Sequence, residues 1–173
     1  MGRVEKLARK LIEDQKVRKP PIPIESIARN LDIKLQFEPF EGKDDISGML
    51  FRNDDHTIIG VNSAHASTRQ RFTIAHEIGH LLLHRGKLFV DTSVKFRDAK
   101  SSLATDRGEI EANAFAAELL MPSDMIHLEV QKKLGKNPTH SMQSLIEEMS
   151  ESFGVSQQAM EYRLANLGIL SLG

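Results

Sequence analysis

Hydrophobic residues near the N-terminus recur at the spacing of one face of an α-helix. The members of this stripe are Val4, Leu7, Ala8, Leu11 and Ile12. Their i, i+3, i+4, i+7 and i+8 spacing predicts a helix over residues 3–15 that docks on a core. The proline-rich segment 19–23 cannot continue this helix, because proline lacks the backbone donor, but Pro23 can open a short second helix over 24–31.

The hydrophobic period then becomes two, which is typical of half-buried strands. Apolar and polar residues alternate over residues 33–38, and two further strand candidates lie at 46–51 and 57–62. The Asn-Asp-Asp turn at 53–55 separates these two, so we expect them to form an antiparallel hairpin. A further short strand is predicted at 94–96.

The remaining chain has mainly helical patterns. Helices are predicted over 69–84 and 109–121, the second ending before Pro122. Three more are predicted at the C-terminal end, over residues 123–134, 142–153 and 156–167. The resulting fold class is α+β, a small antiparallel three-stranded sheet packed with helices.

Composition narrows the class of protein and the kinds of site it can carry. A chain of 173 residues with 40% hydrophobic and 27% charged residues favours one globular domain. A net charge of -1 gives no broad positive field for nucleic acid or anionic membranes. Because cysteine is absent, a metal would need His, Asp or Glu ligands. The N-terminal residues resemble no signal peptide and no stretch reaches membrane-spanning length, so we expect a cytoplasmic protein.

The strongest chemical signal is an H-E-x-x-H motif, His76-Glu77-Ile78-Gly79-His80, within a predicted helix. Histidines at i and i+4 project from one helix face, so both imidazoles can bind one zinc ion. Glu77 lies on the adjacent surface, where it can act as general base towards a zinc-activated water molecule. Two histidines in the core of a buried helix are the alternative, but burying these three polar groups without a metal or partners would cost several kcal/mol.

A catalytic zinc needs a third protein ligand, and the downstream candidates are Glu109 and Glu111. We expect His84 to be a polar residue of the last helical turn rather than a ligand, because it would lie roughly 12 Å along the axis from His76. His65 and Tyr162 are conceivable oxyanion stabilisers, although for each a structural role is favoured.

Two segments carry a family resemblance. Residues 71–80 (RFTIAHEIGH) and 109–122 (EIEANAFAAELLMP) resemble the ImmA/IrrE family of zinc metallopeptidases. The resemblance implies a zincin-like metallopeptidase core with its N-terminal helices over 1–122, a C-terminal helical subdomain over 123–173, and a single domain overall. It also implies a cytosolic bacterial or phage protein that cleaves, and so inactivates, a helix-turn-helix repressor in transcription regulation.

Glu111 is predicted as the third zinc ligand. Asp106 and Glu109 have the spacing of a capping box, which would give Glu109 a structural task at the start of the helix. Glu111 shares a face with Phe115 and should point inward, and the resemblance agrees because Glu111 directly precedes Ala-Asn. Helical geometry alone leaves both glutamates open.

Two other functions remain as alternatives. The segment 144–168 has a helix, a glycine turn and a second helix that could bind DNA, but it is acidic and its second helix offers only Arg163 as a cation. The other alternative is a metal-stabilised module that captures a repressor without cutting it. The intact Glu77 counts against this alternative. If the chain is a peptidase, we expect an extended substrate to pair with an exposed sheet edge beside residues 57–62.

Overall fold

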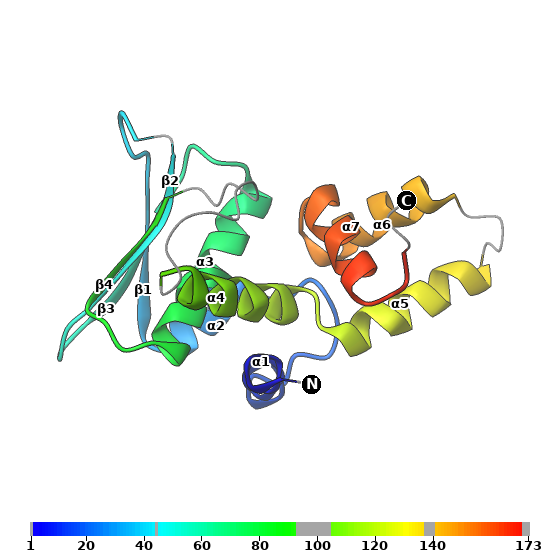
Figure 1. Ribbon diagram of the computed structural model, residues 1–173, viewed down its shortest axis with the longest axis horizontal. Helices are drawn as coiled ribbons and strands as arrows, with labels where there is room; N and C mark the ends of the chain where they lie inside the picture. The colour runs from blue at the N-terminus through cyan, green and yellow to red at the C-terminus, as the bar shows by residue number, and fades with distance from the viewer. Residues whose placement is uncertain (1, 44, 93–104, 137–140, 171–173) are drawn as a thin grey trace.

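The computed structural model describes residues 2–43, 45–92, 105–136 and 141–170. Figure 1 shows a sheet on one side of the molecule, the central helices Ser67–Leu83 and Thr105–Leu120 beside it, and the C-terminal helices on the far side. The elements are α1 (Arg3–Asp14), α2 (Ile24–Asn30), β1 (Ile33–Glu38), β2 (Ile46–Arg52), β3 (Thr57–Asn62), α3 (Ser67–Leu83), β4 (Leu88–Thr92), α4 (Thr105–Leu120), α5 (Ser123–Lys136), α6 (Met142–Phe153) and α7 (Gln157–Asn166). The predicted α+β class is confirmed.

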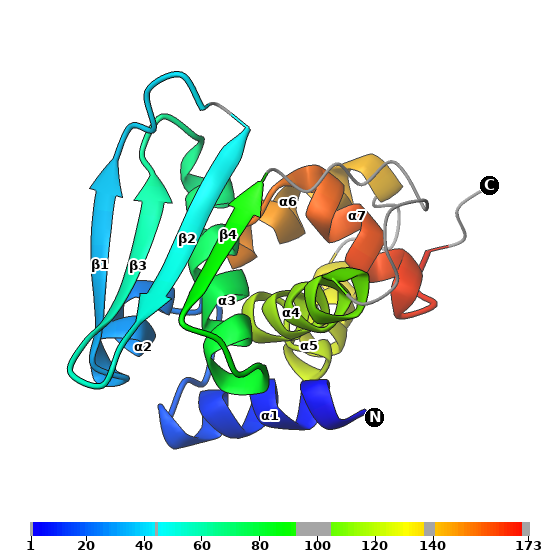
Figure 2. The ribbon, with the colours of Figure 1, turned by 60° about the vertical axis from the view of Figure 1, so that its left-hand side comes forward.

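The sheet differs from the predicted one in number and direction of strands. It has four strands in the order β1-β3-β2-β4, as Figure 2 shows, and it is mixed rather than antiparallel. The hairpin of β2 and β3 is antiparallel as predicted, but β3 also pairs in parallel with β1. Periodicity reveals a strand and not its neighbour, so the insertion of β3 between β1 and β2 could not be inferred from it.

The fourth strand, β4, was not predicted. It pairs antiparallel with β2, with a register irregularity between Ile46 and Gly48. Its five residues, LFVDT, are too few for a clear alternation. The short strand predicted at 94–96 lies outside the described residues.

One face of the sheet packs on the helices and encloses the core. Leu50, Ile59 and Val61 from the sheet are fully buried, as are Ile74 of α3 and Phe115 of α4. Figure 2 shows α3 crossing behind the strands, with α4 beside it. The central helix α3 is therefore held between the sheet and α4.

Two networks of partly buried arginines join segments that are distant in sequence. Glu118 of α4, whose side chain is 2% exposed, forms ion pairs with Arg9 of α1 and Arg163 of α7. Arg71 of α3 donates to the carbonyls of Ile22 at 2.8 Å and Gly154 at 3.0 Å. These contacts attach the N-terminal and C-terminal helices to the two central ones.

Among the described residues, no helix is both long enough and apolar enough to cross a membrane. This agrees with the sequence, in which charged residues interrupt every apolar run before it reaches membrane-spanning length.

Candidate metal centre

Helix α3 presents His76, Glu77 and His80 in the interior of the protein. All three are buried, with His76 and Glu77 fully inaccessible and His80 3% exposed. Ile74 and Ile78 on the same helix belong to the hydrophobic core and fix its orientation. The sequence therefore places three polar side chains where each needs a partner.

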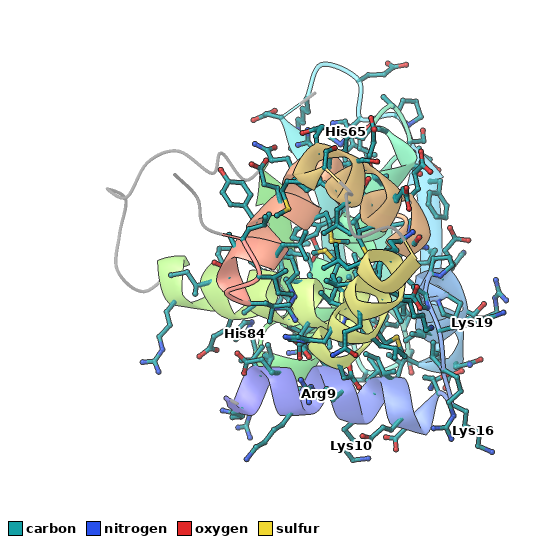
Figure 3. The ribbon with its side chains drawn as sticks, turned by 90° about the vertical axis from the view of Figure 1, so that its right-hand side faces the viewer. Arg9, Lys10, Lys16, Lys19, His65 and His84 are labelled. Carbon is teal, nitrogen blue, oxygen red and sulfur yellow. The ribbon has the colours of Figure 1, made fainter. Side chains whose placement is uncertain are left out.

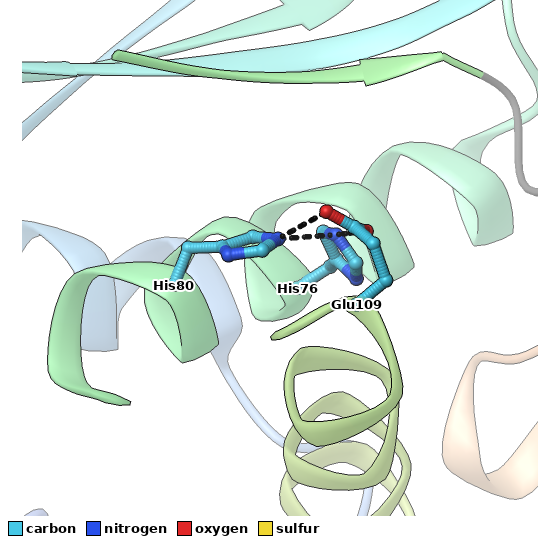
Figure 4. Close-up of side chains that lie close together, drawn as sticks. All are labelled: His76, His80 and Glu109. Atoms are coloured by element: carbon cyan, nitrogen blue, oxygen red, sulfur yellow. Dashed lines mark hydrogen bonds and ion pairs between the residues drawn. The ribbon is translucent and has the colours of Figure 1, made fainter. Parts of the chain in front are cut away.

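The two histidines converge on one point together with Glu109 of α4 (Figure 4). Their Nε2 atoms are 3.0 Å apart. Glu109 Oε2 lies 3.1 Å from His76 Nε2, and Oε1 lies 3.2 Å from His80 Nε2. Two nitrogens and a carboxylate from two helices thus face a common position.

The charge of Glu109 suits this position. Burial raises the pKa of its carboxyl group, but hydrogen bonds from His76 and His80, with their charges, outweigh that effect and lower the pKa to about 2. Glu109 is therefore an anion at neutral pH, as a metal-binding carboxylate must be.

The donor set fits a zinc ion. The three ligand atoms all lie within 4.8 Å of one another. A tetrahedral ion about 2.0–2.1 Å from two imidazole nitrogens would separate them by roughly 3.3 Å, so the observed 3.0 Å requires only a small adjustment. Two histidines and a glutamate are also a ligand set of catalytic zinc sites, which leave the fourth position for water or substrate.

Two close backbone contacts position this site. A Cβ on Gly79 would come within 3.2 Å of Cα and the carbonyl oxygen of Ala112, so α3 and α4 approach closely only because residue 79 is glycine. A Cβ on Gly48 would lie 2.3 Å from Cγ2 of Thr73 and 3.6 Å from Oε1 of Glu77. Strand β2 therefore passes directly over the part of α3 that carries Glu77.

The prediction of Glu111 as third ligand does not agree with this geometry. Glu111 Oε2 lies 3.2 Å from His84 Nε2, away from the pair of His76 and His80. Helix α4 begins at Thr105, so Glu109 lies beyond the first turn of the helix, where a capping box would use it. Glu109 is thereby released from that task, and two residues of helix, about 200° of rotation, separate the directions of the two glutamates.

Both metal-site histidines have partners on their second ring nitrogen. His76 Nδ1 donates to Oδ1 of Asn113 at 3.0 Å, and His80 Nδ1 lies 3.1 Å from Nδ1 of His84. The sequence reasoning missed the contacts of Asn113 and His84. The signal for His84 is its position four residues after His80, a spacing that brings two side chains together.

The predicted oxyanion residues come from segments other than the two helices of the metal centre. The ring of His65 lies 3.5 Å from Nδ2 of Asn62, before the start of α3, and Figure 3 shows His65 well separated from His84. Tyr162 is 44% exposed on α7. An oxyanion role for either residue stays a prediction.

The sheet edge nearest the site is β4 and not the predicted β3. Strand β3 lies between β1 and β2, so its backbone is already paired on both sides and cannot receive a substrate. Strand β4 is a terminal strand, and its Phe89 stacks on His80 with ring centroids 4.7 Å apart. The prediction of an edge beside residues 57–62 is therefore wrong.

Comparison with known proteins places this fold and site in a family. Residues 28–165 match the Peptidase_M78 family, described as the IrrE N-terminal-like domain. The radiation response metalloprotease IrrE of Deinococcus radiodurans is 38% identical over 73 residues, which cover 42% of this chain and 21% of that protein. A protein of Bacillus phage phi105, "Uncharacterized immunity region protein 2", is 29% identical over 90 residues, covering 52% of this chain and 54% of that one.

Solved structures give the same fold. A Mycobacterium tuberculosis transcriptional regulator superposes with a TM-score of 0.62 at 18% identity, covering 95% of this chain and 47% of the regulator. The alignments span about half or less of each of these relatives. Because the family match covers most of the chain, including both segments of the candidate metal centre, the chain belongs to the Peptidase_M78 family of IrrE N-terminal-like metallopeptidases.

Proposed function

We propose that this protein is a zinc-dependent endopeptidase in which His76, His80 and Glu109 hold the metal and Glu77 is the general base. The observation that carries the proposal is the convergence of two buried histidines and the half-buried carboxylate of Glu109, with the buried Glu77 beside them on α3. When bound, zinc would lower the pKa of water and polarise the peptide carbonyl group.

Glu77 is the residue best suited to move the proton. It follows His76 directly on α3, it is fully buried, and β2 covers it at Gly48. A carboxylate there would take up the proton of the attacking water and deliver it to the leaving amine. The covering strand would keep other water molecules away from the carboxylate, which strengthens its interaction with the proton.

The substrate is proposed to bind in an extended conformation along the edge of β4. Backbone pairing with an edge strand holds a peptide with little dependence on its sequence. Phe89 supports this choice, because its contact with His80 fixes β4 next to the metal centre.

The proposed substrate is a helix-turn-helix repressor in the cytoplasm. Its support is the family resemblance, together with relatives whose names describe a radiation response metalloprotease, an immunity region protein and a transcriptional regulator. We also propose that residues 1–173 act as one metallopeptidase domain, supported by the ion pairs of Glu118 with Arg9 and Arg163.

The experiment combines metal analysis with cleavage of the repressor encoded beside the gene. We expect wild-type protein to bind about one equivalent of zinc and cleave the repressor, and Glu77→Gln to keep the zinc and lose cleavage, since an amide cannot take up the proton. Glu109→Ala should lose stoichiometric zinc. Purified wild-type protein without stoichiometric zinc would refute the metal site, and continued cleavage by Glu77→Gln would remove Glu77 as base.

Repressor capture without cleavage is the second candidate function. The same experiment separates it from proteolysis, because a capture module would bind the repressor and leave it intact in both wild-type and Glu77→Gln protein. DNA binding through α6 and α7 is less favoured, because Arg163 donates to the carbonyl of Met121 and pairs with Glu118. A duplex affinity that falls steeply with salt would support DNA binding instead.

A further inference from the structure

A chain of side-chain contacts leads from His80 to the protein surface. His80 Nδ1 lies 3.1 Å from His84 Nδ1, and His84 Nε2 lies 3.2 Å from Glu111 Oε2. The exposed fraction of the side chains rises along this chain from 4% for His80 to 19% for His84 and 35% for Glu111. We propose that His84 and Glu111 are positioning residues that fix the ring orientation and tautomer of His80 for metal binding, an inference that rests on the proposed zinc site.

The proton positions along this chain follow from its far end. The Glu111 carboxylate can only accept a hydrogen bond, so the Nε2 atom of His84 carries the proton. A neutral His84 then has a lone pair on Nδ1, which accepts from the Nδ1–H of His80. In the zinc-bound protein the Nε2 atom of His80 would then offer its lone pair to the ion, and this is the atom that faces His76 and Glu109.

The end of helix α3 makes this contact possible. The helix ends at Leu83, and His84 has extended backbone angles, φ -120° and ψ 153°. Arg52 of β2 holds this turn, because it donates to the carbonyls of Leu81 at 3.1 Å and His84 at 2.7 Å. These hydrogen bonds from Arg52 hold the backbone of His84 in place, and the His84 ring is thereby kept against His80.

The two metal-site histidines are oriented in different ways. His76 donates directly to the amide oxygen of Asn113, whereas His80 reaches a carboxylate through a second imidazole. Outer partners of this kind typically change metal affinity by about 10–100-fold when removed. Glu111 does not contact His76 or His80. Through His84, it should nevertheless have a measurable effect on zinc binding.

Zinc affinity, measured by competition with a chelator at fixed pH, tests the proposal. We expect His84→Phe, which keeps an aromatic ring and removes both hydrogen bonds, and Glu111→Ala to weaken zinc binding by about 10–100-fold while one equivalent still binds at saturation. His84→Gln should recover part of the loss, since an amide can accept from His80 and donate to Glu111. Arg107→Ala is the matched control, because Arg107 lies 3.6 Å from Glu111 and is 84% exposed, and we expect less than a twofold change.

The double variant distinguishes positioning through His84 from an independent effect. If Glu111 acts through His84, then Glu111→Ala in the His84→Phe background should cause no further loss of zinc affinity. Thermal unfolding of the metal-free variants should match that of metal-free wild type, which separates the effect from a general loss of structure.

Three results would overturn the inference. These are additive losses in the double variant, affinities within twofold of wild type for both single variants, and a complete loss of zinc in Glu111→Ala, which would make Glu111 a direct ligand. Each requires that wild-type protein binds zinc. Wild-type protein without zinc would instead refute the proposed function itself.

Discussion

Replacing Gly79 with alanine tests whether the close approach of α3 and α4 builds the metal centre. The added Cβ would lie 3.2 Å from Cα and the carbonyl oxygen of Ala112 and 3.2 Å from Cδ1 of Phe115. Two of these three contacts are with backbone, so α4 has to shift by a few tenths of an ångström. Glu109 is on α4, one turn before Ala112, and would move with it.

The magnitude follows from two opposing effects. Alanine is favoured over glycine in a helix by about 1 kcal/mol. Overpacking of a core contact costs about 1–3 kcal/mol. The Gly79→Ala variant should therefore be destabilised by roughly 0–2 kcal/mol, because the closest atoms are backbone and cannot change rotamer.

Gly135→Ala on α5 is the matched control. Gly135 is exposed, and a Cβ there would have nothing within 4 Å. Only the preference of alanine over glycine in a helix then affects stability, so the free energy of unfolding should rise by roughly 0.5–1 kcal/mol. The stabilities of the two metal-free variants are compared by thermal unfolding. Each kcal/mol should shift the melting temperature by about 2–4 °C in a chain of this size. Zinc affinity should fall only in Gly79→Ala. Equal stabilisation of the two variants, with zinc affinity unchanged, would refute the reasoning.

Four further substitutions test other parts of the structure. Arg163→Met should lower the free energy of unfolding by about 3–5 kcal/mol in urea denaturation, because the buried Glu118 loses a cation. Arg9→Met should lower it less, because the Arg9 side chain is 31% exposed. A larger loss of stability in Arg9→Met than in Arg163→Met would contradict this reasoning. Ser156→Ala should cost about 1 kcal/mol in the same assay by removing the side-chain cap of α7, and an unchanged urea midpoint would argue against the cap. Phe89→Leu should lower the free energy of unfolding by about 1 kcal/mol, because it removes the ring stack on His80. It should also raise KM for the substrate more than it lowers kcat. An unchanged KM would show that β4 does not bind the substrate.

Local patterns accounted for most of the helices and for the core of the site. The predicted helix over 3–15 corresponds to α1, and the one over 69–84 to α3 with slightly shifted ends. His76, Glu77 and His80 needed no tertiary information, because their spacing on a single helix brings them together whatever surrounds that helix. The family was also readable from segments 71–80 and 109–122, since both carry their motif in consecutive residues.

The sequence alone did not determine the sheet order or the third member of the metal centre. Strand pairing depends on which segments meet after folding, so neither the parallel β1–β3 pair nor the edge position of β4 was visible in hydrophobic alternation. Likewise, Glu109 and Glu111 are both in the first turns of α4 and have the same chemistry. Only the rotation of α4 against α3, set by the contact of Gly79 with Ala112, brings Glu109 to the histidines and leaves Glu111 beside His84.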